Sequence, residues 1–271
     1  MEKKEILKKV KEIELRSNLW AKEVFSGSYY SCFHGNGMEF TEVRRYAPGD
    51  EIKNIDWKVT ARQGKAYVKK YVEERELGVY LLVDVSSSNQ YIQQKQMIAE
   101  LLTTIAFSAN SNDDKVGGLF FTDKIERFLP LKKGKKHSLS ILDFYLSMKN
   151  ETQKTDISYA IDYVSKVVKK NSIIFIISDF LDDNCEDSIK LLSKKHDVIL
   201  IRVLEREIVS LPKGAIFNFF DSETGEEIIY ENFKEDIDLI KELSFKNSFT
   251  IYSDEDYRKK LLKFFKERRK K

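Results

Sequence analysis

Residues 78–88 read GVYLLVDVSSS, and this stretch decides the fold class. The run that ends at Asp84 is mostly apolar, which is typical of a strand buried on both faces of a parallel sheet. The serines that follow end the strand. Residues 91–111 then place apolar side chains at helical spacing, which predicts a long helix that packs on its surroundings. A buried strand followed by a helix is the repeating unit of an α/β fold.

The alternation of strand and helix continues toward the end of the chain. Because parallel neighbours need long crossover connections, this order predicts an α/β domain with a mostly parallel central sheet and helices on both faces. A β-hairpin is expected around Asp221 to Gly225. The other predicted elements are strands at 116–121, 172–178, 197–204 and 249–253, helices at 137–148, 156–170 and 183–195, a helix from Asn232 and a basic final helix from Asp254.

The N-terminal part of the chain has a different pattern. Apolar residues within 2–24 recur at spacings of three, four and seven, which predicts an amphipathic helix. Such a helix could cover the chain's own sheet edge or bind a partner. Glycines punctuate residues 25–76, as expected for turns and short strands. We therefore expect an N-terminal helix and a turn-rich β extension over 1–76, followed by the α/β domain over 77–271.

Composition excludes several classes of protein. The 47 Lys+Arg and 44 Asp+Glu residues leave a formal charge of +3, too small to predict a general attraction to nucleic acid or to an anionic membrane. The basic run at 266–271 is interpreted as a solvated helix end. Cys32 and Cys185 are far apart and form no CxxC pair, so neither a disulfide framework nor a zinc site is indicated. No signal peptide or membrane span is recognisable, and we expect a cytoplasmic protein.

Polar residues follow the predicted strands at three places. They are the segment that begins at Asp84, the pair Thr155-Asp156 at a helix start, and the pair Ser178-Asp179. In an open α/β sheet, ligands bind beyond the carboxyl ends of the strands, so these residues are candidates for a site. Each place alone is more simply interpreted as a helix cap or a turn.

Together, the three places resemble the metal-ion-dependent adhesion site of von Willebrand factor A domains. That resemblance implies a von Willebrand factor A-like fold that binds Mg²⁺, or Mn²⁺, through oxygen ligands. It implies hydroxyl ligands from Ser86, Ser88 and Thr155, with Asp84 and Asp179 acting mainly through bound water. One position would stay open for an Asp or Glu of a partner protein. The alternative is a structural polar cluster without metal.

A series of motifs carries a second resemblance: Gly37-Met38-Glu39-Phe40, Arg44-Arg45-Tyr46, Pro48-Gly49-Asp50, Ile55-Asp56-Trp57, Thr60-Ala61-Arg62, Val68-Lys69-Lys70-Tyr71, Glu73-Glu74-Arg75 and Asp114-Lys115-Val116-Gly117. They resemble the signature of a bacterial family known as domain of unknown function 58, whose members are commonly encoded beside MoxR-type AAA+ ATPases. The resemblance implies an adaptor or co-chaperone whose partner is such an ATPase or its client. The chain has Ser88-Asn89 where many relatives have Ser-Met, a change outside the implied ligands.

The segment from Arg44 to Tyr71 allows a second hypothesis. Its basic and aromatic residues could form a nucleic-acid surface. Alternatively, its basic side chains could form a structural ion-pair network with Asp50, Asp56 and the pair Glu73-Glu74. We favour the network, because carboxylates at this density would repel phosphates. A turn is predicted at Pro48-Gly49-Asp50.

Catalysis has little support in the sequence. The three histidines lie in separate predicted elements, and no GxSxG, HExxH or Gly-rich phosphate loop is present. A Mg²⁺-dependent phosphohydrolase is the least favoured hypothesis, because such sites usually use more carboxylates than occur here. We therefore expect a metal-dependent binding module rather than an enzyme.

Overall fold

The structure is a computed structural model that describes residues 38–73, 77–86, 92–148, 154–180, 185–205, 210–211, 215–220, 227–232, 237–238 and 243–269. The predicted helix at 2–24 and the predicted ligand Ser88 lie outside these residues. The chain divides into two compact units. One comprises Phe33–Glu76, and the other contains Leu77–Lys271.

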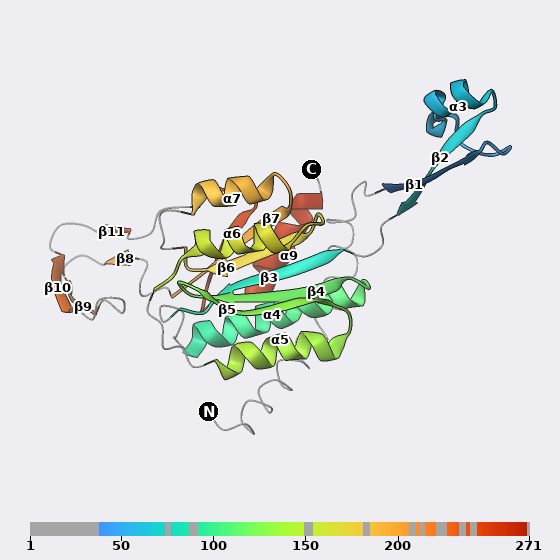
Figure 1. Ribbon diagram of the computed structural model, residues 1–271. Coiled ribbons are helices and arrows are strands. Elements are labelled where there is room, and N and C mark those ends of the chain that lie inside the picture. Colours follow the sequence, from blue (N-terminus) through green and yellow to red (C-terminus); the bar gives the residue numbers. More distant parts are fainter. Residues whose placement is uncertain are drawn as a thin grey trace. The chain divides into compact units, whose positions relative to one another are not determined.

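A six-stranded sheet forms the centre of the larger unit (Figure 1). Its order is β12-β7-β6-β3-β4-β5, and every neighbouring pair is parallel except β4 with β5. Numbered along the chain, these strands lie in the order 3-2-1-4-5-6 when read from β5, which is a doubly wound arrangement. The strands are β3 (Gly78–Asp84), β4 (Lys115–Phe121), β5 (Ile125–Lys132), β6 (Ile173–Ser178), β7 (Asp197–Leu204) and β12 (Ser248–Tyr252).

Helices cover both faces of this sheet (Figure 1). On one face, α6 (Ile157–Val167) and α7 (Glu186–Ser193) share a buried apolar cluster with side chains of β3, β4, β6 and β7. On the other face, Phe120 of β4 packs on Phe144 of α5 (Lys135–Ser147). The side-chain amide of Gln94 in α4 (Ile92–Ser111) donates a hydrogen bond to a backbone carbonyl of β7. The final helix α9 (Tyr257–Arg269) meets α4 through Tyr257 and Thr104. The predicted α/β class, with a mostly parallel sheet and helices on both faces, is confirmed.

Two expectations require correction. The strand β5 was not predicted, because Pro130 and exposed polar residues interrupt its apolar pattern. The pairing of β5 with β4 shifts register between Val116 and Gly118, opposite Pro130, as expected for a proline on an edge strand. The predicted helix from Asn232 is wrong in the described residues: Asn232 ends β10, and Ile237–Asp238 form β11. Cross-strand pairing outweighs local helical spacing there.

Short antiparallel pairs complete this unit. The strand β9 (Ala215–Phe220) pairs with β10 (Glu227–Asn232), and β8 (Ser210–Leu211) pairs with β11. The first pair flanks the hairpin predicted around Asp221 to Gly225, although the turn itself lies outside the described residues. None of the helices in the described ranges combines the length and apolarity that a membrane span requires.

The smaller unit is an antiparallel pair of strands, β1 (Met38–Arg45) and β2 (Tyr67–Glu73). A 3-10 turn η2 (Ile52–Asn54) and the short helix α3 (Trp57–Gln63) connect them. The predicted turn at Pro48-Gly49-Asp50 is confirmed: the Asp50 amide donates to the Ala47 carbonyl, and Gly49 has a φ of +106°. Only glycine adopts such a φ without strain.

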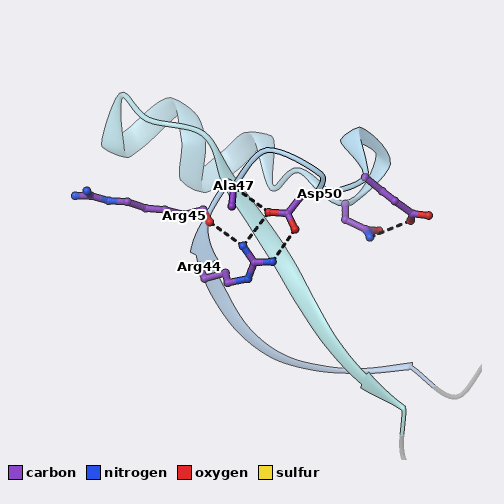
Figure 2. Close-up of polar contacts among 6 residues, drawn as sticks. Arg44, Arg45, Ala47 and Asp50 are labelled. Carbon is purple, nitrogen blue, oxygen red and sulfur yellow. Dashed lines mark hydrogen bonds and ion pairs between the residues drawn. The ribbon is translucent and has the colours of Figure 1, made fainter.

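An ion pair fixes this turn to β1, as Figure 2 shows. The Arg44 guanidinium donates to both carboxylate oxygens of Asp50, at 2.8 and 2.6 Å. The same carboxylate accepts a 2.8 Å hydrogen bond from the Ala47 amide. The nitrogen of Lys69 lies 3.9 Å from Asp56. The favoured ion-pair network therefore includes at least two of its expected acidic members.

Two adjacent glycines in β4 provide a test of sheet packing. A Cβ at Gly117 would lie 2.9 Å from both the Leu129 carbonyl and the Tyr80 ring, whereas one at Gly118 would meet ordinary contacts of 3.4 Å or more. We predict that Gly117→Ala lowers the free energy of unfolding by about 1–3 kcal/mol. The matched Gly118→Ala should change it little. Urea denaturation measures both, and equal effects would contradict this packing.

Candidate functional site

The predicted site lies where the strand order of the sheet reverses. The strand β3 lies between β4 and β6, and the chain crosses from one side of β3 to the other between them. Val83 of β3 pairs with Ile177 of β6, so Asp84 and Ser178 end neighbouring strands side by side. Doubly wound sheets bind ligands at this switch point, because the connections diverge there and leave the strand ends accessible.

The Asp84 carboxylate is fully buried and accepts hydrogen bonds from three segments. Its Oδ1 accepts from the Ser86 amide at 2.9 Å and, over a longer 3.5 Å, from the Thr155 hydroxyl. Its Oδ2 accepts from the Ser178 hydroxyl at 2.8 Å. Asp84 thus joins the ends of β3 and β6 to the start of α6.

Backbone contacts hold these segments in place. The Val85 amide donates to the Phe121 carbonyl at the end of β4. The next carbonyl, that of Thr122, accepts from the Asp156 amide, and the Asp156 side chain caps α6 by accepting from the Tyr159 amide. The pair Thr155-Asp156 therefore divides its roles: Asp156 is a helix cap, while Thr155 reaches Asp84.

Asp179 follows β6 and is also buried. The Ser178 hydroxyl lies 3.5 Å from its Oδ1, so Ser178 bridges the two carboxylates. The same hydroxyl accepts from the Phe180 amide at 3.1 Å. Phe180 has a φ of +52°, which is uncommon for a residue with a side chain and indicates a backbone that its surroundings hold in place.

Electrostatics oppose the charge on Asp84. Burial, and next the negative charge of Asp179, raise the pKa of Asp84 to about 6, although the donors from Ser86 and Ser178 oppose that shift. A nearby cation would offset this rise in the pKa of Asp84, because it favours the charged form of both carboxylates. The residues present therefore suit a hard divalent cation: two carboxylates and several hydroxyls, all oxygen donors.

A buried cation, Arg202, also belongs to this cluster and was not predicted. Arg202 lies in β7 as the register partner of Ser178, and it is almost completely buried. Burial lowers the pKa of Arg202, and the charge of Asp179 opposes that shift. The signal in the sequence was a single charged residue inside the otherwise apolar stretch VILIRVL.

The structure thus places Asp84, Ser86, Thr155 and Asp179 within one cluster, together with the candidate Ser178, and it adds Arg202. Ser88 lies outside the described residues. In the part of the chain that the structure describes, no group of three or more His, Cys, Asp or Glu side chains could hold a metal ion. Any ion at this cluster would be bound by two carboxylates and by hydroxyl groups. The metal-ligand roles of these residues stay a prediction.

One comparison matches most of the chain to a protein family. Residues 42–238 match the family described as "Protein of unknown function DUF58". An uncharacterized protein of Mycobacterium tuberculosis is 27% identical over 209 residues, which cover 74% of this chain and 66% of that protein. The chain therefore spans about two thirds of the length of this relative.

Solved structures with some similarity include a conserved hypothetical protein, BatB, from Bacteroides thetaiotaomicron. It is 16% identical, with a TM-score of 0.45, over 72% of this chain and 100% of that one. The SpRpn10 VWA domain is 14% identical, with a TM-score of 0.34, over 48% of this chain and 76% of that one.

The raised pKa of Asp84 predicts how stability depends on pH without metal. The folded protein keeps the proton of Asp84 up to about pH 6, whereas the unfolded chain releases it near 3.8. Stability should therefore fall as pH rises through this window, by up to about 3 kcal/mol. Asp84→Asn carries no such charge, and its amide can donate to Ser178, whose hydroxyl can turn toward Asp179.

We therefore expect Asp84→Asn to be more stable than the wild type at pH 7 in EDTA, with the difference vanishing near pH 4. Urea denaturation of both proteins at several pH values measures it. A difference in stability that does not change between pH 4 and pH 7 would show that folding does not raise the pKa of Asp84.

Arg202 and Asp179 form a second testable pair. Removing one partner leaves a buried charge uncompensated, so Arg202→Met should lower the free energy of unfolding by about 3 kcal/mol in EDTA. Adding Asp179→Asn should restore much of that loss. A double-mutant cycle measures the coupling energy between the two residues, and strictly additive losses would show that Arg202 does not interact with Asp179.

Proposed function

Since the chain belongs to the family described as "Protein of unknown function DUF58", a description that names no activity, we propose its function from the site itself. The protein is a metal-dependent protein-binding module. The observation that carries this proposal is the pair of buried carboxylates, Asp84 and Asp179, that share the Ser178 hydroxyl at the switch point of the sheet.

Mg²⁺ or Mn²⁺ is the cation that this donor set suits. Asp84, Ser86, Thr155 and Asp179 would hold it, with Ser88 as a further candidate from the sequence. Mg²⁺ accepts oxygen ligands and commonly keeps several waters, so a site with few carboxylates is sufficient. A bound cation would supply a ligand position that a carboxylate of a partner can fill.

The charge balance of the cluster supports an acidic partner. Two carboxylates and one guanidinium leave a formal charge of −1 among the buried side chains. A divalent cation would change that charge to +1, which attracts an anionic group. Arg202 therefore matters for function, because without it the occupied site would be neutral. Partner binding would therefore depend on metal as well as on shape.

For the partner, we propose a MoxR-type AAA+ ATPase or its client protein. The support is the resemblance of the signature motifs to the bacterial family, whose members are commonly encoded beside such ATPases. The partner would contribute an Asp or Glu to the metal, and the protein would act as an adaptor or co-chaperone in the cytoplasm.

Two alternatives have weaker support. A nucleic-acid surface between Arg44 and Tyr71 would draw on cations that are partly used elsewhere, since Arg44 pairs with Asp50 and Lys69 lies near Asp56. A Mg²⁺-dependent phosphohydrolase would use the same two carboxylates, and turnover of a phosphoester that disappears in Asp84→Asn would favour it.

Metal binding predicts a specific gain in stability. At a Mg²⁺ concentration of about 100 times its Kd, the free energy of unfolding should rise by about 2.7 kcal/mol. Asp84→Asn should lose this gain. The matched control is Asp187→Asn on α7, whose side chain is 99% exposed and outside the cluster. Urea denaturation with Mg²⁺ and with EDTA measures the effect, and an equal gain in Asp84→Asn would refute metal binding at this cluster.

Partner binding is tested with the tagged full chain and a purified MoxR-type ATPase. We expect retention with Mg²⁺, and loss of retention with EDTA or in Asp84→Asn. Retention that ignores both would reject a metal-bridged contact. Metal-dependent stabilisation without any retention would leave the metal site in place and reject the ATPase as the partner.

A further inference from the structure

The helix α3 of the smaller unit presents an exposed face that the contacts described within that unit do not use. Trp57, Lys58, Ala61 and Arg62 are all exposed, while Val59 and Thr60 between them are half-buried. Positions i, i+1, i+4 and i+5 lie on one side of an α-helix, so these four residues form a single surface. We refer to them as the α3 face.

The residues around the α3 face have structural roles. The Asp56 carboxylate caps the helix by accepting from the amides of Lys58 and Val59. The Thr60 hydroxyl accepts from the Tyr67 amide, and Gly64 ends the helix with a φ of +65°. These contacts fix where α3 begins and ends, and how it is attached to β2.

The α3 face itself has no such role. In the described part of the chain, the side chains of Trp57, Lys58 and Arg62 make no hydrogen bond, ion pair or ring contact. Trp57 is 68% exposed, and Ile52 of the neighbouring η2 turn is 69% exposed. Burying apolar surface of this size against a partner would be favourable, at roughly 25 cal/mol per Å² removed from water.

The charge of the α3 face is entirely positive. Lys58 and Arg62 belong to it, Lys65 follows it, and no carboxylate lies on it. The acidic residues nearby are engaged with other cations: Asp50 with Arg44, Glu51 with Lys53 and Asp56 with Lys69. The complementary partner is therefore anionic and offers an apolar contact.

We propose that the α3 face binds an acidic segment of a partner protein. Trp57 is the apolar anchor at one edge of the face, and Lys58 and Arg62, one helical turn apart on the same side of it, pair with carboxylates of the partner. Trp and Arg are the residues that most often dominate protein interfaces. Nucleic-acid stacking surfaces usually present several successive aromatic rings, whereas the α3 face has a single ring, that of Trp57. The inference does not depend on the metal site, which lies in the other unit.

The test uses the full chain with Trp20→Phe, which leaves Trp57 as its one tryptophan. The probe is a labelled glutamate-rich peptide that contains leucine, with its glutamine counterpart as the uncharged control. Binding is measured by polarization of the label, and the Trp57 emission reports where the peptide lies. All measurements are made in EDTA, so that loss of the metal site does not affect the result.

We expect the glutamate peptide to bind and to change the Trp57 emission, while the glutamine peptide does not. Arg62→Gln should weaken binding by about twofold to fivefold, and Trp57→Ala by at least about fivefold. The matched control is Lys53→Gln, which removes an equal charge from the same unit outside the α3 face. Because the altered side chains are exposed, thermal melts should show unchanged folding.

Three results would overturn the proposal. Equal weakening by Lys53→Gln and Arg62→Gln would show that binding follows net charge alone. Tighter binding of a single-stranded oligonucleotide than of the glutamate peptide would assign the face to nucleic acid. A Trp57 that is already shielded from a soluble quencher without any probe would show that the face is covered by the chain itself.

Discussion

The buried carboxylate of Asp84 is the constraint on which the site depends. A charge inside a protein is tolerated only when hydrogen bonds or opposite charges compensate it. Here the donors come from the segment after β3, from the end of β6 and from the start of α6. Satisfying one carboxylate therefore fixes the relative position of three connections. The same requirement explains why the Ser178 hydroxyl lies between Asp84 and Asp179.

The remaining charge explains how such a site could act. The two negative charges of Asp84 and Asp179 exceed the one positive charge of Arg202, so the cluster would attract a cation. Arg202 limits that excess, which keeps the metal-free fold stable and leaves an occupied site attractive to a carboxylate. Affinity for a partner would then depend on metal, whereas the protein would fold without it and be further stabilised by it. The α3 face of the smaller unit would offer an acidic partner a second, metal-independent contact.

Much of this arrangement could be predicted from the sequence, because the decisive features are local. The apolar run to Asp84 gave the bounds of β3 correctly, and the polar residues after β3 and β6 meet because parallel strands end at one edge of a sheet. The strand β5 was missed because an edge strand with Pro130 has little apolar periodicity. Arg202 was missed because its role depends on the pairing of β7 with β6, which no local pattern encodes.

The most direct test of the central proposal is a crystal structure of the full chain grown with Mn²⁺, with data collected at the manganese absorption edge. The account predicts one strong anomalous peak within reach of Asp84, Ser86, Thr155 and Asp179, with at least one ligand position filled by water or by a carboxylate of a neighbouring molecule. Crystals of Asp84→Asn should lack the peak. Wild-type crystals with no peak at this cluster, although saturated with Mn²⁺, would contradict it.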